Sequence, residues 1–150
     1  MLKNLISKSK GFTLIEVVIV LAIAGLIFII VFLAVSQAQA SRRDTQRKSD
    51  ADRLRAAVNQ YASNNNGNVP TSQANINTVT GSYLTNFADP NGTTYAVTYQ
   101  TSAPGGVNNI SFSAGNICNG NAMTTTGAGA RDFAVLGFLE RGGVFCVDSR

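Results

Sequence analysis

The side chains that could perform chemistry are few. The chain has two cysteines, Cys118 and Cys146, and no histidine. A single pair of cysteines in a chain with an export segment most simply forms one disulfide in an oxidising compartment; the alternative is two buried free thiols. We expect no metal site and no bound cofactor, because neither cysteine has another cysteine or a histidine near it in the sequence.

Common catalytic motifs are missing from the sequence. It offers no histidine as a general base, no G-x-S-x-G elbow and no phosphate-binding loop. Its eight carboxylates show no paired arrangement of the kind that acid–base catalysis uses. We therefore expect that the protein is not an enzyme.

One carboxylate, Glu16, has an unusual position. It directly precedes an apolar run, Val17–Val35, that contains no charged or strongly polar residue. A carboxylate costs about 3 kcal/mol at the centre of a bilayer and somewhat less near the edge, so such a group is expected to have a function and a cationic partner. A structural alternative is a capping box, because Thr13-x-x-Glu16 fits the S/T-x-x-E pattern at a helix start.

The apolar run Val17–Val35 is about as long as a bilayer is thick. As a helix it would measure roughly 28 Å, against a hydrocarbon core of about 30 Å. A short stretch with Lys3, Lys8 and Lys10 precedes it. One interpretation is a secretory signal peptide cut after Ala40, although the run is longer than the apolar region of such peptides. Another is a plain membrane anchor.

A third interpretation comes from the residues around Gly11. The stretch Lys10-Gly11-Phe12-Thr13-Leu14-Ile15-Glu16-Val17-Val18 resembles the class III leader junction of type IV pilins and pseudopilins. The match combines a short lysine-bearing leader, a Gly-Phe junction, a Thr-Leu-Ile-Glu sequence and a long apolar run. This combination is highly specific, and the close resemblance covers about residues 8–35.

The resemblance implies a role for each residue at the junction. A prepilin peptidase would cleave after Gly11, whose lack of a Cβ lets an extended backbone enter a protease site closely. The new N-terminus, Phe12, would be N-methylated. Glu16 would pair with the amine of Phe12 on a neighbouring subunit, and it would favour the correct axial register because an ion pair in low dielectric is strong only when its groups meet.

The resemblance also implies a domain organisation and a function. Residues 1–11 would be the cleaved leader, 12–40 the transmembrane and polymerisation half of a long helix, and 41–150 its amphipathic half plus a globular sheet domain. The implied protein is a structural subunit of a type IV pilus that acts in adhesion, twitching motility or DNA uptake. It would be a single-pass precursor in the cytoplasmic membrane and then part of an extracellular filament. Its partners would be copies of itself, a prepilin peptidase and methylase, and the inner-membrane assembly machinery.

Two alternative functions stay open. The first is a pseudopilin or minor pilin of a type II secretion or competence system, because Asp89-Pro-Asn-Gly…Tyr95 resembles a motif of major pseudopilins. Those proteins carry a calcium site in an acidic loop, whereas no acidic residue occurs here between Asp89 and Asp132. A disulfide that closes the C-terminal region is a pilin-like feature. The second alternative is a secreted adhesin cleaved after Ala40.

These residues would be positioned by an α+β fold, with one long N-terminal helix on a small antiparallel sheet of three or four strands. No proline interrupts residues 12–69, so we expect a helix from about Phe12 to Ser63. Its second half carries an apolar stripe at spacings of three and four, and Asn64–Gly67 indicates its end. The stripe consists of Ala51, Leu54, Val58 and Tyr61.

Local patterns predict the remaining elements. Residues 65–93 are rich in Asn, Thr and Ser and are expected to form a loop with a helical turn near Ser82–Phe87. Alternation predicts strands, the last two as a hairpin around Arg141-Gly142-Gly143. The predicted strands are Thr94–Gln100, Asn109–Ser113, Phe133–Glu140 and Val144–Val147.

The net charge of +4 is mainly a property of the leader, because three of the twelve basic residues precede Gly11 and leave nine against eight acidic ones. A second group of basic residues lies between Arg42 and Arg55, interleaved with Asp44, Asp50 and Asp52. This pattern indicates a solvated, salt-bridged helix face. The alternative is a surface that contacts DNA or anionic lipid.

Overall fold

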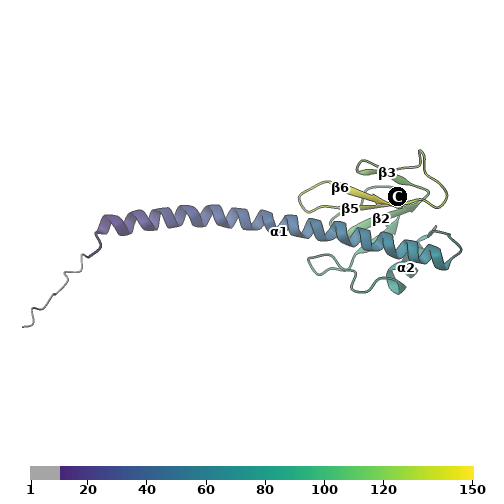
Figure 1. Ribbon diagram of the computed structural model, residues 1–150, viewed down its shortest axis with the longest axis horizontal. Coiled ribbons are helices and arrows are strands. Elements are labelled where there is room, and N and C mark those ends of the chain that lie inside the picture. Colours follow the sequence, from purple (N-terminus) through teal and green to yellow (C-terminus); the bar gives the residue numbers. More distant parts are fainter. Residues whose placement is uncertain (1–10) are drawn as a thin grey trace, which may run out of the picture. The chain divides into compact units, whose positions relative to one another are not determined.

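The computed structural model of the chain describes residues 11–150 (Figure 1). The three lysines of the predicted leader, Lys3, Lys8 and Lys10, lie outside the described residues. The chain divides into two units, one ending at Ala38 and one from Gln39 to Arg150. Helix α1 (Leu14–Asn64) contributes residues to both units, and its bounds agree with the predicted helix to within two residues.

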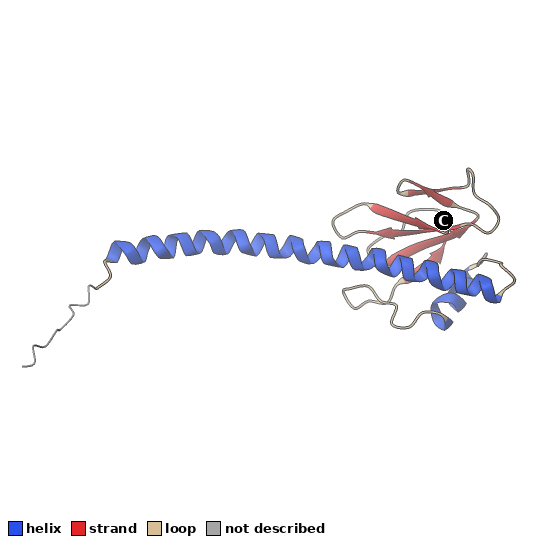
Figure 2. Ribbon diagram, in the orientation of Figure 1, coloured by secondary structure: helices blue, strands red, loops and turns tan. Residues whose placement is uncertain are grey.

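The second unit is built on a four-stranded sheet, drawn in red in Figure 2. Strands β2 and β5 pair antiparallel, and so do β5 and β6, which form the predicted hairpin. The predicted α+β fold is therefore confirmed. The strands, in the order in which they pair, are β1 (Ala96–Tyr99), β2 (Asn109–Ala114), β5 (Phe133–Phe138) and β6 (Val144–Asp148).

One edge of the sheet differs from the prediction. Strand β1 pairs with β2 in parallel, with Val97 opposite Ile110, so the expectation of a wholly antiparallel sheet was wrong at this edge. Residues 100–108 return the chain to the start of β2, with Ala96 N donating to the carbonyl of Asn108 at 2.9 Å. This connection is shorter than the dozen or more residues that usually join parallel strands.

The sequence patterns also missed two elements. Helix α2 (Gln73–Ser82) lies in the stretch that we expected to be a loop, and the side chain of Ser72 caps it by accepting a hydrogen bond from the Asn75 N–H. A separate two-stranded sheet pairs β3 (Ile117–Asn119) with β4 (Ala122–Thr124). Its turn contains Gly120 with φ +62°, a conformation that glycine adopts without steric cost.

The core of the second unit lies between α1, α2 and the sheet, which overlap in Figure 1. The predicted stripe on α1 is confirmed, because Leu54 and Val58 are fully buried and Tyr61 is partly buried against the core. Phe112 of β2 and Phe133 of β5 are also fully buried, with ring centroids 5.6 Å apart. Burial of each such side chain contributes about 1.5 to 3 kcal/mol, which explains why this half of α1 is held by its own domain.

Candidate processing and assembly site

Helix α1 begins with a capping box formed by Thr13 and Glu16. The Thr13 N–H and hydroxyl both donate to Oε2 of Glu16 at 2.8 Å, and the Glu16 N–H approaches the Thr13 hydroxyl at 3.4 Å. These bonds satisfy backbone donors that the first turn of a helix leaves unpaired. Among residues 11–150, Oε1 of Glu16 has no hydrogen-bond partner, so capping leaves half of the carboxylate able to accept from another molecule.

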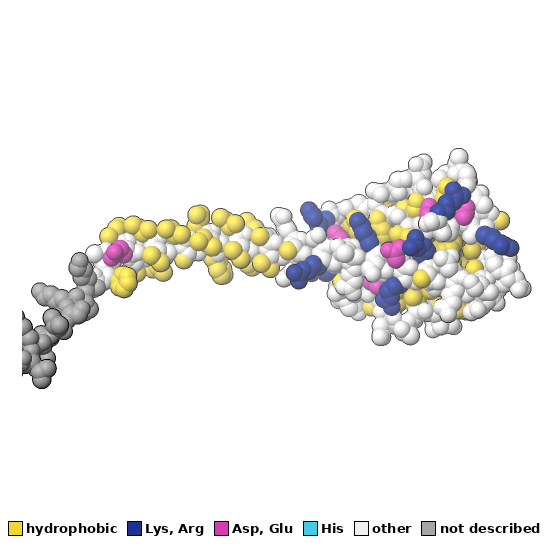
Figure 3. Space-filling model, in the orientation of Figure 1, with side chains coloured by type: hydrophobic (Ala, Val, Ile, Leu, Met, Phe, Trp, Pro, Cys, Tyr) yellow, Lys and Arg dark blue, Asp and Glu magenta, His cyan; other side chains and the backbone are white. Residues whose placement is uncertain are grey.

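The residues that follow Glu16 expose an unusual amount of apolar surface. Every large hydrophobic side chain from Phe12 to Val35 is exposed, by between 48% and 90% of its surface. Figure 3 shows this part of α1 as an almost continuous run of yellow side chains, with magenta acidic atoms near its start. Monomeric soluble proteins rarely expose contiguous apolar patches of this kind, which mark membrane or protein contacts.

Phe12 and Glu16 border the same hollow at the start of α1. The hollow measures about 450 Å³ and is otherwise lined by Val17, Val20 and Leu21. Phe12 is 90% exposed, so the described residues supply almost no cover for its ring. The structure therefore brings two of the predicted site residues together, next to an apolar surface and the Glu16 oxygen that has no partner in the described part of the chain.

Neither Gly11 nor Gly25 is required by its contacts with residues 11–150. An added Cβ at either position would meet no described atom within 4 Å, and neither has a positive φ. Helix α1 continues without a break through Gly25, although glycine there costs about 1 kcal/mol relative to alanine. A need for glycine at these positions would therefore come from another molecule that approaches the backbone closely.

By length and composition, α1 is able to cross a membrane, and it is the one such helix among residues 11–150. Its most apolar window has no side chains buried within the structure. A helix satisfies its own backbone hydrogen bonds, which a segment in lipid must do. The apolar part of α1 is therefore suited either to a bilayer or to a bundle of like helices.

Cys118 and Cys146 form a disulfide in the second unit. It links β3 to β6, and the Cys118 N–H also donates to the Asp148 carboxylate at 2.9 Å. Cys118 thus lies on a short strand that the sequence patterns missed. The bridge closes a sequence separation of 28 residues and fixes the two-stranded sheet to the edge of the larger one.

A buried ion-pair cluster is the feature that the sequence patterns missed. Arg47 is only 2% exposed and donates to the carboxylates of Asp89 at 2.7 Å, Asp44 at 2.9 Å and Glu140 at 3.3 Å. Asp50, on the same helix, is 4% exposed and accepts from the hydroxyl of Tyr95. The prediction of a solvated helix face was therefore wrong for these residues.

The cluster joins three segments that are distant in the sequence. Arg47 on α1 binds Asp89, at the turn before β1, while Arg43 donates to Glu140, which follows β5. Hydrogen bonds from Arg43 and then Arg47 hold the pKa of Glu140 at about 2, below its ordinary value. The interleaved charges at spacings of three were the signal in the sequence. Their burial could not be read from it, because the covering segments lie more than forty residues away.

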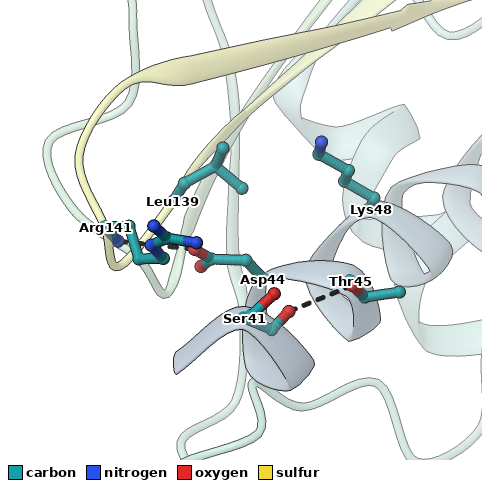
Figure 4. A pocket seen from close by; sticks show the side chains of 6 residues that line it. All are labelled: Ser41, Asp44, Thr45, Lys48, Leu139 and Arg141. Carbon is teal, nitrogen blue, oxygen red and sulfur yellow. Dashed lines mark hydrogen bonds between the residues drawn. The ribbon is translucent and has the colours of Figure 1, made fainter. Parts of the chain in front are cut away.

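Beside this cluster lies a second, polar hollow of about 320 Å³ (Figure 4). The Thr45 hydroxyl donates to the Ser41 carbonyl at 3.0 Å, and the Arg141 N–H approaches Asp44 at 3.4 Å. The side chains of Lys48 and Arg141 flank Leu139 in this view. No sequence motif indicated that residues of α1 and of the β5–β6 turn would share a surface.

The comparisons with known proteins bear on the N-terminal part of the chain. Residues 6–32 match the family model described as the prokaryotic N-terminal methylation motif. The chain matches no curated protein and no solved structure. The matched residues include Gly11, Phe12 and Glu16, whose arrangement is described above. This motif, the apolar helix that follows it and the α+β architecture together show that the chain carries the class III leader of type IV pilins and pseudopilins and has an arrangement like the type IV pilin fold.

Proposed function

We propose that this chain is a structural subunit of a type IV pilus. A prepilin peptidase removes residues 1–11, Phe12 is N-methylated, and the apolar segment 12–40 then assembles with copies of itself into the core of a filament. Residues 41–150 form the outer part of each subunit. Before assembly the subunit lies in the cytoplasmic membrane with a single pass, and after assembly it belongs to an extracellular filament.

The observation that carries this proposal is the exposed apolar segment 12–40, whose single carboxylate is Glu16. Among residues 11–150, the large hydrophobic side chains of Val17–Val35 remain exposed and Glu16 keeps one oxygen without a partner. A bundle of sister helices would bury the apolar surface. Cleavage after Gly11 would create a cation for Glu16, because it frees the amine of Phe12 close to where an adjacent copy would present its carboxylate.

A pair of variants separates this role of Glu16 from capping. Thr13→Val removes the hydroxyl of the capping box but keeps the carboxylate, whereas Glu16→Gln keeps a capping oxygen but removes the charge. We expect Glu16→Gln to reduce filament yield about tenfold or more, the effect of losing roughly 1.4 kcal/mol per contact. Thr13→Val should assemble nearly normally. Both chains should be cleaved, as measured by the mass of the membrane-bound subunit.

Equal loss of filaments in the two variants would show that Glu16 acts only through the capping box. Normal filament yield with Glu16→Gln would remove its role in assembly altogether. In either case, cleavage after Gly11 is measured separately, so a processing defect is not mistaken for an assembly defect.

A pseudopilin or minor pilin is the second candidate, and the segment Asp89–Tyr95 favours it. This segment resembles a pseudopilin motif and forms a turn in which the Gly92 N–H donates to the Asp89 carbonyl at 2.8 Å. Imaging decides between the candidates. Surface filaments composed mainly of this chain support the pilus subunit, while short periplasmic assemblies or a rare component at the filament tip support the alternative.

A further inference from the structure

Three exposed cations border the buried ion-pair cluster: Lys48 and Arg141 line the same hollow, and Arg42 directly precedes Arg43 on α1. Arg42 and Lys48 are on α1, and Arg141 is in the turn between β5 and β6; we name these three residues the basic collar. Within residues 11–150, none of the three forms an ion pair. By contrast, Arg43 and Arg47, which lie between Arg42 and Lys48 in the sequence, both form ion pairs with carboxylates.

The nearby acidic groups neutralise the basic collar only in part. Asp89 and Asp44 are occupied by the buried Arg47, and Asp44 also accepts from the backbone N–H groups of Glu140 and Arg141. Glu140 is bound by Arg43. Counting the whole group, five cations face three carboxylates, which leaves an excess positive charge of two that faces solvent.

Two of the three cations line the hollow in Figure 4, so part of the positive charge lies in a concave site. Lys48 and Arg141 line it together with the hydroxyl-bearing Ser41 and Thr45 and the apolar Leu139. The carboxylate of Asp44 also lines the hollow, where Arg47 and the Glu140 N–H already donate to it. Ammonium and guanidinium groups bind phosphate oxygens strongly, and a serine hydroxyl can add a neutral hydrogen bond. Leu139 offers a contact to hydrocarbon or glycerol carbons. The lining therefore fits a phosphodiester that carries an apolar neighbour.

The position of the basic collar in the chain favours lipid over DNA. Ser41 follows Val35 by six residues, which span at most roughly 22 Å even when fully extended. A membrane that holds Val17–Val35 thus brings its headgroups to this surface at high effective concentration, whatever the arrangement of the two units. An excess of two charges is small for DNA, where proteins commonly neutralise about six to ten phosphates. The same excess is enough to bind an anionic membrane surface, because each basic residue near it contributes about 1 kcal/mol of attraction.

We propose that the basic collar binds the phosphate groups of anionic phospholipids while Val17–Val35 spans the membrane, and so holds the globular unit at the membrane surface before assembly. This inference rests on the proposed function, because it requires the apolar segment to be a membrane anchor. The contact must be released when the subunit enters a filament, since lipid headgroups are then exchanged for neighbouring subunits.

The test uses the full chain, cleaved after Gly11, in nanodiscs of phosphatidylcholine mixed with phosphatidylglycerol. Native mass spectrometry of the released protein counts the lipids of each kind that stay bound. We expect the wild-type chain to retain phosphatidylglycerol preferentially, and Lys48→Gln/Arg141→Gln to lower that preference about tenfold. The matched variant Arg55→Gln/Arg131→Gln removes the same charge outside the basic collar and should behave like the wild type.

Each other outcome has a distinct meaning. Equal retention of the two lipids by the wild type, or an equal drop in both double variants, would overturn the role of the basic collar and leave the proposed function intact. Tighter binding of duplex DNA than of phosphatidylglycerol, lost in Lys48→Gln/Arg141→Gln, would replace lipid by nucleic acid as the ligand. Failure of the wild-type chain to enter neutral nanodiscs would refute the membrane anchor, and with it both proposals.

Discussion

The guanidinium of Arg47 binds the carboxylate of Asp89 through two hydrogen bonds, from Nε at 2.7 Å and from Nη2 at 3.1 Å, with both side chains almost completely buried. The pair joins α1 to the turn before β1. Bidentate arginine–carboxylate pairs fix both distance and orientation. The pair thereby determines how the end of the long loop after α2 lies on the helix.

Asp89→Asn should destabilise the second unit strongly. It removes the charge that compensates Arg47 inside the protein, and loss of one partner of a buried pair costs about 3 to 5 kcal/mol. Because Asp44 and Glu140 still bind Arg47, we expect the lower end of this range. Guanidinium unfolding of the chain in detergent, followed by near-ultraviolet circular dichroism, measures the change.

The control for this prediction is Asp52→Asn, because Asp52 pairs with Arg55 at the surface and its side chain is 54% exposed. Surface pairs contribute about 0 to 1 kcal/mol. Equal effects of the two substitutions would show that burial of the Arg47–Asp89 pair has no special energetic role.

The pH dependence of the unfolding free energy should reveal how much Glu140 contributes to stability. Hydrogen bonds from Arg43, and then from Arg47, hold its folded pKa at about 2, whereas its ordinary value is 4.5. A lowered folded pKa means that the native state binds the proton less readily than the unfolded chain. The stabilisation is therefore fully present above about pH 4.5 and is lost as the pH falls toward 2.

Comparison with Glu140→Gln measures this contribution. The difference in unfolding free energy between the two chains should be constant from pH 7 to about pH 5 and should shrink at lower pH. The effect will be modest, because the Glu140 side chain is 34% exposed and solvent screens its charge. A difference that grows on acidification would contradict the assignment.

Gly137→Ala should disrupt the β5–β6 hairpin. An added Cβ would lie 2.3 Å from Cζ of Phe145, a buried ring that cannot move away without disturbing the core. Overpacking of this kind costs about 1 to 3 kcal/mol. Gly81→Ala is the matched control: its Cβ meets nothing within 4 Å in α2, and the change should stabilise the helix by up to about 1 kcal/mol. Thermal unfolding of both variants would test the contrast, and similar melting temperatures would refute it.

Loss of the disulfide should lower stability without preventing cleavage of the leader. For a sequence separation of 28 residues, the chain-entropy model gives about 3.5 kcal/mol for the Cys118–Cys146 bridge. The double variant Cys118→Ser/Cys146→Ser should unfold at correspondingly lower denaturant, and the wild type should match it when reduced. Unchanged stability in the double variant would mean that the rest of the fold already fixes β3 against β6.

The sequence was most informative where one physical effect dominated. The apolar run and the absence of proline predicted α1, and alternation around Arg141-Gly142-Gly143 predicted the β5–β6 hairpin. The Thr13–Glu16 pattern predicted the capping box as an alternative, and its hydrogen bonds are present. In each case, neighbouring residues alone determine the local structure.

The elements that were missed depend on distant residues. Helix α2 is rich in Asn and Thr, which favour helices weakly, and its burial rests on just Ile76 and Val79. The parallel pairing of β1 depends on the path of the loop between β1 and β2, and the burial of Arg47 depends on the loop that contains Asp89. Neither loop has a regular sequence pattern. The hollow beside Lys48 and Arg141 likewise exists only because the β5–β6 turn meets α1.

The central claim is that the chain is processed at Gly11, and the mass of its mature N-terminus tests this most directly. Intact-protein and peptide mass spectrometry of the membrane-bound or filament form should identify Phe12 as the first residue, carrying one methyl group on its amine. A mature chain that begins at Ser41, or an N-terminus that retains Met1, would contradict the account.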